Sequence, residues 1–521
     1  MIRFFMGLIR GLFGRNRRKE GACRIRRVMS AGLFIALTTT APGNGQNADM
    51  EEAFPALQGL RFGVSVTDLD GNVLEAHRAD ERFTPASNMK LFVTAAALEA
   101  ETELAALESG LQVVLEYPAS GPPNLVLVGR GDPTVGVGPS CDAGCLESLA
   151  ASVSATGIEQ VGDIIGDDQW FADERKPLGW SWDDLKFGHG TAISAIAVND
   201  NVLPLRVSPA NEAEANVRAT WIDGASGYFD LNNEAVTQDG DGQPALRLER
   251  RIGDETARLY GELPLGSRSF KLSLGVDNPA HLAAWYFKQA LVAEGIVVTG
   301  QLRTRRRPLQ FADEPVLTDP DDPDAPLQCA ASAQDTPGAV PIASLDPAPL
   351  QDIVTRINRD SQNLYAEVLL RQLGRAAGIG ASFCGLLQIE DFLTEIGVER
   401  ASYDIADGSG LSNYNRATPA TITALLRHAA TAPWGEAFLA SLPVSGGAKG
   451  TLKYRFRGTA LDGKVFAKTG TLNHVDALSG YLTARSGQTL VFSIIVNDRP
   501  LESPSAMPLI EQTLLSIAEQ Y

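Results

Sequence analysis

Histidine and cysteine are scarce in this chain of 521 residues, which contains only five of each. The histidines are scattered, no H-E-x-x-H sequence occurs, and the cysteines form no paired C-x-x-C motifs, so we expect no metal and no cofactor. The chain also lacks a G-x-S-x-G elbow, which disfavours an ordinary Ser-His-Asp hydrolase. Hydrophobic residues at 44% and charged residues at 21% are nevertheless ordinary for a protein with a buried core.

Positive charge is depleted outside the N-terminal region. The formal net charge is −18, although residues 1–41 contain nine arginines and lysines and a single acidic residue, Glu20. The rest of the chain is therefore strongly acidic and repels the phosphates of nucleic acid and anionic lipid headgroups, so we expect no nucleic-acid partner.

Long hydrophobic runs are also lacking. The apolar run at residues 28–37 follows the basic pair Arg26-Arg27 and precedes small residues. A membrane-spanning helix needs about 20 apolar residues, so this pattern predicts a secretory signal peptide over residues 1–41, with an uncleaved anchor as the alternative. Because no second long run occurs, we expect no stable transmembrane segment after cleavage.

Four cysteines remain once residues 1–41 are removed. In an oxidising compartment Cys141, Cys145, Cys329 and Cys384 allow three pairings. Of these we expect Cys141–Cys145 and Cys329–Cys384, with a zinc site as the competing interpretation.

Strand patterns at the two ends of the chain predict one antiparallel sheet covered by helices, an α+β architecture. The early part of this sheet contains a hairpin that turns at residues 68–72. The expected strands are residues 62–67, 73–77, 465–472, 477–484 and 489–497, and the expected helices include residues 87–98 and 505–520.

The middle of the chain interrupts this domain. Residues 101–345 contain many short strand-like runs, which predict a mostly β insertion of two subdomains. Eight of the 29 prolines lie between Pro315 and Pro349, where we expect a loop that returns the chain to the first domain. The main domain is therefore expected to comprise residues 54–100 and 346–521.

The first chemical motif is Ser87-Asn88-Met89-Lys90, at the start of an expected helix. Residues three apart share a helix face, so the Ser87 hydroxyl and the Lys90 amine can meet, and the amine can remove the hydroxyl proton. An S-x-x-K sequence arises about once by chance in such a chain. None of the other nine lysines, however, has a serine three residues earlier. The alternative is a helix cap beside an exposed lysine.

A second motif, Ser361-Gln362-Asn363, lies between two helical runs. A hydroxyl and an amide two residues apart on a tight turn can point into one cleft. Ser and Asn are also common at turns as caps, which is the alternative interpretation.

A third motif, Lys468-Thr469-Gly470-Thr471, lies on an expected strand. A cation and hydroxyls at a strand edge suit a substrate carboxylate, and glycine permits close approach of a substrate backbone. The alternative is an exposed strand lysine.

The order S-x-x-K, S-x-N and K-T-G resembles the signature of the active-site serine penicillin-binding proteins and β-lactamases. Ser87 and Ser361 are 274 residues apart, and this long gap resembles the low-molecular-mass penicillin-binding proteins of the D-alanyl-D-alanine carboxypeptidase/endopeptidase family. Gln362 departs from the family, where Asp is commoner. Other matching stretches are GDPT at 131–134, GWSWDDL at 179–185, AIAVNDN at 195–201, NLYAEVLL at 363–370, DGSGLS at 407–412 and LPVSGGAKGTL at 442–452.

The resemblance implies a penicillin-binding protein/β-lactamase-like transpeptidase domain and an exported serine DD-peptidase that forms an acyl-enzyme and is acylated by penicillin. Its substrates would be the D-Ala-D-Ala termini or the D-Ala-meso-diaminopimelate cross-links of peptidoglycan. The implied catalytic residues are Ser87, Lys90, Ser361, Asn363 and Lys468. The implied substrate-binding residues are Thr469, Gly470 and Thr471, and the backbone N–H groups of Ser87 and Thr471 would form the oxyanion hole.

A substrate stem peptide carries amines, so an acidic residue beside the cleft is also expected. Asp167 or Asp168 is the candidate, with a solvated turn as the alternative.

Two other functions compete with the DD-peptidase. One is a β-lactamase, which the long insertion disfavours, and the other is a non-catalytic wall-binding protein on the same scaffold, which the complete set of catalytic side chains disfavours. A periplasmic location is expected. The sequence leaves open whether the protein is peripheral to the inner membrane and whether it is a homodimer.

Overall fold

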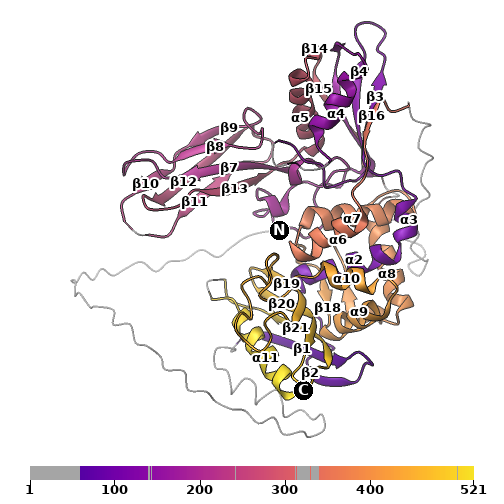
Figure 1. Ribbon diagram of the computed structural model, residues 1–521, viewed down its shortest axis with the longest axis vertical. Coiled ribbons are helices and arrows are strands. Elements are labelled where there is room, and N and C mark those ends of the chain that lie inside the picture. Colours follow the sequence, from indigo (N-terminus) through magenta and orange to yellow (C-terminus); the bar gives the residue numbers. More distant parts are fainter. Residues whose placement is uncertain are drawn as a thin grey trace, which may run out of the picture. The chain divides into compact units, whose positions relative to one another are not determined.

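The computed structural model describes residues 59–138, 141, 144–240, 242–310, 313, 329, 340–501 and 503–521. The signal peptide expected over residues 1–41 lies outside this part of the chain. Two segments far apart in the sequence, residues 59–105 and 350–521, together build one sheet and its covering helices, as Figure 1 shows.

The central sheet is antiparallel, with strand order β19-β20-β21-β1-β2. Strand β1 joins the two halves of the sheet, because Arg61 to Asp68 pair with Asn497 to Leu490 of β21. These strands are β1 (Arg61–Asp68), β2 (Val73–His77), β19 (Val465–Leu472), β20 (Val475–Thr483) and β21 (Thr489–Asn497).

Helices cover both faces of this sheet because its central strands alternate between two apolar faces. On β21, Val491 and Ile495 join the helical core, whereas Phe492 and Ile494 are buried on the other side. The helices of this part are α2 (Lys90–Glu99), α3 (Glu101–Ala105), α6 (Leu350–Arg359), α7 (Asn363–Ala377), α8 (Ser382–Glu395), α9 (Pro419–Thr431), α10 (Gly435–Ser441) and α11 (Met507–Gln520), with a short pair β17 (Tyr403–Asp404) and β18 (Arg416–Ala417).

The inserted segment contains a second five-stranded sheet, of order β15-β6-β4-β3-β16. Helices α4 and α5 pack beside it around a separate apolar core. Its elements are β3 (Leu111–Glu116), β4 (Asn124–Gly129), α4 (Leu146–Ser154), β5 (Gln160–Val161), β6 (Ile164–Ala172), α5 (Pro279–Ala293), β14 (Val297–Val298), β15 (Leu302–Arg307) and β16 (Ala343–Leu345).

The remaining strands of the insertion form smaller sheets around a third core that includes Leu205, Leu259 and Leu274. Two subdomains within the insertion remain our proposal, supported by these separate cores. The strands are β7 (Val202–Ser208), β8 (Arg218–Trp221), β9 (Asp230–Asn233), β10 (Val236–Gln238), β11 (Ala245–Glu249), β12 (Thr256–Pro264) and β13 (Phe270–Gly275).

The strands predicted for the main sheet are confirmed within two residues at each end. The helix expected over residues 87–98 begins differently, because its first turn is a 3-10 helix, η2 (Ala86–Met89), that leads into α2. The terminal helix starts at Met507 rather than at residue 505, where the Ser505 hydroxyl donates a hydrogen bond to Asp476 instead.

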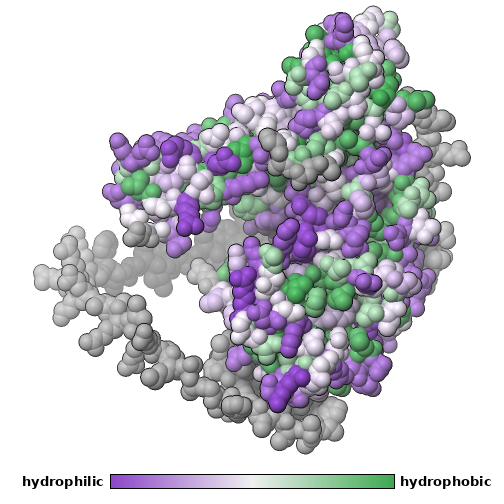
Figure 2. Space-filling view, in the orientation of Figure 1, coloured by the Kyte–Doolittle hydropathy of each residue, from purple (hydrophilic) through white to green (hydrophobic). Residues whose placement is uncertain are grey.

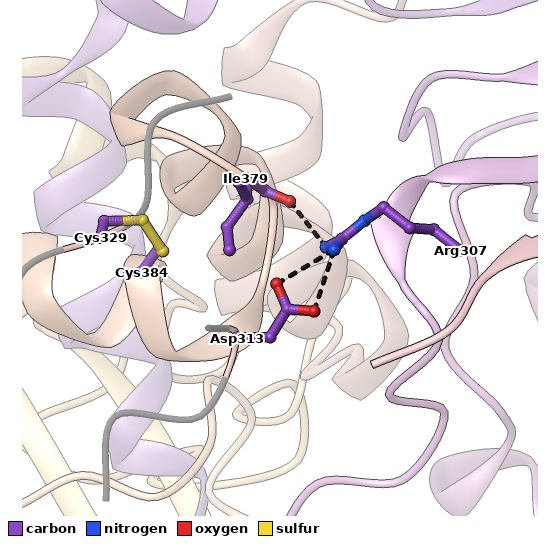
Figure 3. Close-up of a disulfide and its surroundings, with 5 residues drawn as sticks. All are labelled: Arg307, Asp313, Cys329, Ile379 and Cys384. Carbon is purple, nitrogen blue, oxygen red and sulfur yellow. Dashed lines mark hydrogen bonds and ion pairs between the residues drawn. A yellow bond between two sulfur atoms is a disulfide. The ribbon is translucent and has the colours of Figure 1, made fainter. Parts of the chain in front are cut away.

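Both expected disulfides are confirmed: Cys141 bonds to Cys145, and Cys329 bonds to Cys384 at the start of α8. Figure 3 shows the second disulfide near an ion pair between Arg307 and Asp313. Arg307 also donates a hydrogen bond to the carbonyl of Ile379. The disulfide therefore joins the end of the insertion to α8, and the hydrogen bond from Arg307 joins it to the segment just before α8.

Breaking the Cys329–Cys384 disulfide by Cys329→Ala is expected to lower the free energy of unfolding by about 4 kcal/mol, because the bond restricts a long loop in the unfolded chain. The matched control, Cys141→Ala, opens a loop with a sequence separation of only 4. It should cost about 2 kcal/mol. Urea unfolding of the oxidised proteins measures both values, and an equal loss in the two variants would contradict this account.

In the part of the chain that the structure describes, no helix is long and apolar enough to cross a membrane. On the face drawn in Figure 2, hydrophobic residues gather in separate patches among hydrophilic ones.

Candidate active site

The Ser87 hydroxyl and the Lys90 amine meet because η2 is a 3-10 turn. Three residues per turn place positions i and i+3 directly above one another. Lys90 Nζ lies 2.9 Å from Ser87 Oγ, and the lysine is fully buried. Ala86, immediately before Ser87, has a positive φ of 49°, a strained conformation for a residue with a side chain. The turn is held in place by Asn88, which donates a hydrogen bond to Ser479 on β20.

Asn363, the first residue of α7, brings the second motif to the same amine. Its Oδ1 lies 2.6 Å from Lys90 Nζ, while its Nδ2 donates to the backbone carbonyl of His189 at 2.8 Å. Because a carbonyl only accepts, His189 fixes which way the amide faces. The Ser409 carbonyl is the third partner of Lys90 Nζ, at 2.5 Å.

Ser361 and Lys468 form a second serine–lysine pair across the cleft. Lys468 Nζ donates to Ser361 Oγ at 2.8 Å and to the carbonyl of Thr469 at 2.9 Å. Ser361 has a positive φ of 61°, so the turn before α7 is strained at this residue. Gln362, between the two motif residues, donates a long hydrogen bond of 3.4 Å to Asp200 of the insertion.

The third motif lies along β19, beside η2. Thr471 faces the cleft, whereas the Thr469 hydroxyl hydrogen bonds to the hydroxyl of Thr451. A Cβ on Gly470 would lie 2.8 Å from the carbonyl of Pro85 and 3.2 Å from Ala86. Tight packing of β19 against η2 therefore explains this glycine, rather than room for a substrate backbone.

These groups open onto a cleft of about 590 Å³. One wall comes from the insertion, where Asp184 Oδ1 lies 3.1 Å from His189 Nε2 and the His189 ring stacks on Phe187. The residues that line it include Ser87, Ser361, Asn363, Thr471, Asp183, Asp184, His189 and Arg499.

Burial controls the charge of the two lysines. It lowers the pKa of Lys90 to about 7, although the buried carboxylates of Asp407 and Glu367 oppose this shift. Burial, and then repulsion by Lys90, also hold the pKa of Lys468 well below its usual value. A substantial fraction of Lys90 is therefore a neutral amine near pH 7, with a lone pair free to accept a proton.

Asp167 and Asp168 do not join this cleft. Both lie on β6, where Asp167 accepts the N–H of Gln169 and Asp168 pairs with Arg175. Parallel pairing with β15 places Asp167 opposite Arg305, so the carboxylate of Asp167 already forms an ion pair within the inserted sheet. The acidic residues that line the cleft are instead Asp183 and Asp184. They belong to the GWSWDDL stretch, which the sequence analysis noted without assigning it a role.

The chain matches the D-Ala-D-Ala carboxypeptidase 3 (S13) family over residues 45–321 and 329–520. It belongs to this family. A D-alanyl-D-alanine carboxypeptidase of Actinomadura sp. (strain R39) is 36% identical, over 87% of this chain and 80% of that protein. A D-alanyl-D-alanine carboxypeptidase, DacB, of Haemophilus influenzae is 25% identical, over 89% of this chain and 91% of that protein.

The fold agrees with this membership. The crystal structure of penicillin binding protein 4 from Haemophilus influenzae superposes with a TM-score of 0.71 at 22% identity and covers 91% of this chain and 99% of that chain. The penicillin-binding-protein fold expected from the three motifs is therefore confirmed.

Proposed function

We propose that this serine D-Ala-D-Ala carboxypeptidase uses Ser87 as its nucleophile and acts on the D-Ala-D-Ala termini, and on the D-Ala-meso-diaminopimelate cross-links, of peptidoglycan. The observation that carries the proposal is the set of three hydrogen-bond partners around Lys90 Nζ. Asn363 Oδ1 and the Ser409 carbonyl can accept its two N–H groups, which leaves the lone pair of the neutral amine facing Ser87 Oγ.

Acylation starts with transfer of the Ser87 proton to Lys90 as Oγ attacks the carbonyl of the penultimate D-alanine. The backbone N–H groups of Ser87 and Thr471 stabilise the oxyanion. Ser361 then relays a proton to the leaving amine, and Lys468 keeps the local field positive. Water hydrolyses the acyl-enzyme in a second step, while a β-lactam leaves a stable acyl group on Ser87.

Substrate recognition is divided between the two walls of the cleft. Thr469 and Thr471 hydroxyls bind the terminal carboxylate, and Asp184, with Asp183 beside it, attracts an amine of the stem peptide. We therefore assign to Asp184 the attraction of a stem-peptide amine that the sequence analysis had assigned to Asp167 or Asp168.

Intact mass of the protein after incubation with benzylpenicillin tests the proposal, with Ser87→Ala as the paired variant. We expect a persistent adduct of one penicillin on the wild type and none on the variant. Rapid loss of free penicillin without an adduct would indicate a β-lactamase instead. Intact penicillin with no adduct would indicate a non-catalytic wall-binding protein, and either result would reject the proposal.

Asp184→Asn is expected to raise KM about tenfold for a stem peptide with a free side-chain amine, because a charge-assisted contact at a half-buried carboxylate is lost. The same peptide with its amine acetylated is the matched substrate and should show no change. Acylation by benzylpenicillin, which lacks that amine, should also be unaltered. An equal loss with both peptides would indicate that Asp184 only supports the shape of the cleft.

We also propose that the protein is exported to the periplasm, where its substrate lies. The basic N-terminal region, the apolar run at residues 28–37 and the two disulfides support this location.

A further inference from the structure

Two carboxylates are buried behind Lys90, and the proposed acyl transfer uses neither. Glu367 on α7 and Asp407 in the loop before β18 are both fully buried, and Arg371, one turn after Glu367, is 1% exposed. Buried carboxylates are costly unless they are paired and hydrogen bonded. Their positions beside the reacting amine therefore need an explanation.

Glu367 holds the backbone that contacts Lys90. Its Oε1 accepts the N–H groups of Gly408 and Ser409, at 3.0 and 2.9 Å, while its Oε2 pairs with Arg371 Nη1 at 3.1 Å. The carbonyl of Ser409 is the group that accepts from Lys90 Nζ. Glu367 is thus connected to the Lys90 amine through Ser409, whose N–H bonds to Glu367 and whose carbonyl accepts from Lys90.

Asp407 holds the other half of the same loop. It accepts hydrogen bonds at both oxygens, and one comes from the insertion, because Trp180 Nε1 donates to Oδ2 at 2.8 Å. The donors within the loop are the N–H groups of Gly410 and Ser412, the Ser409 hydroxyl and Asn415 Nδ2.

Arg371 is also tied to the insertion. Its Nη2 donates to the backbone carbonyl of Glu174 at 3.0 Å and lies 3.5 Å from the carboxylate of that residue. Glu174 and Trp180 therefore hold, respectively, the arginine and the aspartate of the buried group.

The charges of the buried group are balanced when one lysine is neutral. Its basic groups are Lys90, Lys468 and Arg371, and they face two negative charges when Glu367 and Asp407 are both ionised. Burial raises the pKa of Glu367 to about 7, whereas Arg371 and the hydrogen bond from Ser409 favour its ionised form. With both lysines protonated the group carries an excess positive charge in a region without solvent, which is unfavourable. Each buried carboxylate therefore affects how readily the amine of Lys90 gives up its proton.

We propose that Glu367 is a positioning residue for the acyl transfer: it holds the Ser409 carbonyl against Lys90 Nζ and supplies part of the negative charge that this amine faces. The proposal rests on the proposed role of Lys90. The charged groups around Lys90 are Glu367, Asp407 and Lys468, and those around Glu367 are Arg371, Asp407 and Lys90.

The test is the rate of acylation by a fluorescent penicillin, measured for Glu367→Gln across the pH range in which the rate of the wild type rises. Removing the carboxylate favours the neutral amine, so the midpoint of the rise should move to lower pH by about one unit. The maximal rate should fall about tenfold because the Ser409 carbonyl is held less firmly.

Asp313→Asn is the matched control. Asp313 is also buried, pairs with Arg307 Nη1 (Figure 3) and accepts one backbone N–H, from Gln310, but it follows β15 of the insertion and has no bond to Lys90 in the described structure. In the Asp313→Asn variant, the midpoint of the pH dependence and the maximal acylation rate per folded molecule should equal those of the wild type. An unchanged midpoint in Glu367→Gln, or an equal shift in Asp313→Asn, would overturn the proposal.

Glu367→Asp keeps the test decisive if the glutamine variant does not fold. The shorter carboxylate retains the charge but cannot span the distance to Arg371 and to both N–H groups. We expect the wild-type midpoint with a maximal rate lowered about tenfold. A folded aspartate variant with the wild-type rate would refute the positioning role. Loss of acylation in the wild type itself would instead reject the proposed function.

Discussion

Lys90→Met is expected to lower the rate of acylation by benzylpenicillin about 10⁴-fold, because it removes the group that takes the Ser87 proton. Methionine fills a volume similar to that of the lysine stem and needs no hydrogen bond. The free energy of unfolding should fall by only about 1–3 kcal/mol, because Asn363 Oδ1 and the Ser409 carbonyl lose their donor while a buried amine is replaced by an apolar group. Stopped-flow acylation and thermal melting measure the two quantities separately.

Lys464→Met is the control for this variant, since Lys464 is an exposed lysine just before the same strand as Lys468. Its acylation rate should match that of the wild type. A Lys90→Met protein that still forms the penicillin adduct at a rate near that of the wild type would show that another group acts as the base.

Asn363→Asp is expected to lower acylation at pH 7 by roughly 50- to 100-fold, and the cause is electrostatic. A carboxylate 2.6 Å from Lys90 Nζ favours the ammonium form. It should raise the pKa of Lys90 by about 2 units above its value near 7. The neutral fraction falls accordingly at pH 7, and the rate should recover as the pH is raised past the new pKa.

The recovery at alkaline pH separates this effect from simple damage to the site. The new carboxylate also faces the His189 carbonyl without a proton to donate, which should cost about 1–3 kcal/mol of stability. Asn413→Asp is the control, because Asn413 contacts Ser181 near the cleft and has no bond to Lys90 in the described structure. A rate that stays low at every pH would contradict the electrostatic explanation.

The local patterns that the sequence predicted correctly are those set by short-range physics. Short apolar runs along β1 and β21 reflect strands that are buried on both faces of one sheet, so these strands could be identified from the chain alone. The pairing of Ser87 with Lys90 is also local, since a single turn of helix brings them together.

The errors arose where contacts are long-range. Asp167 or Asp168 was the candidate because the amines of a stem peptide call for an acidic residue, but the place of Asp167 is decided by the pairing of β6 with β15, more than a hundred residues later. Asp184 reaches the cleft only because the insertion folds back so that His189 meets Asn363.

By itself, the sequence determined the family, the three motifs and the main sheet, because each depends on residue types at fixed short spacings and in a fixed order. Only the tertiary structure decided the charge of the lysine amines and the orientation of the side chains within those motifs. Burial of Lys90, the amide orientation imposed by His189 and the loop held by Glu367 and Asp407 all come from segments distant in the chain. The cost of desolvating a charge depends on everything packed around it, and no local pattern records that environment.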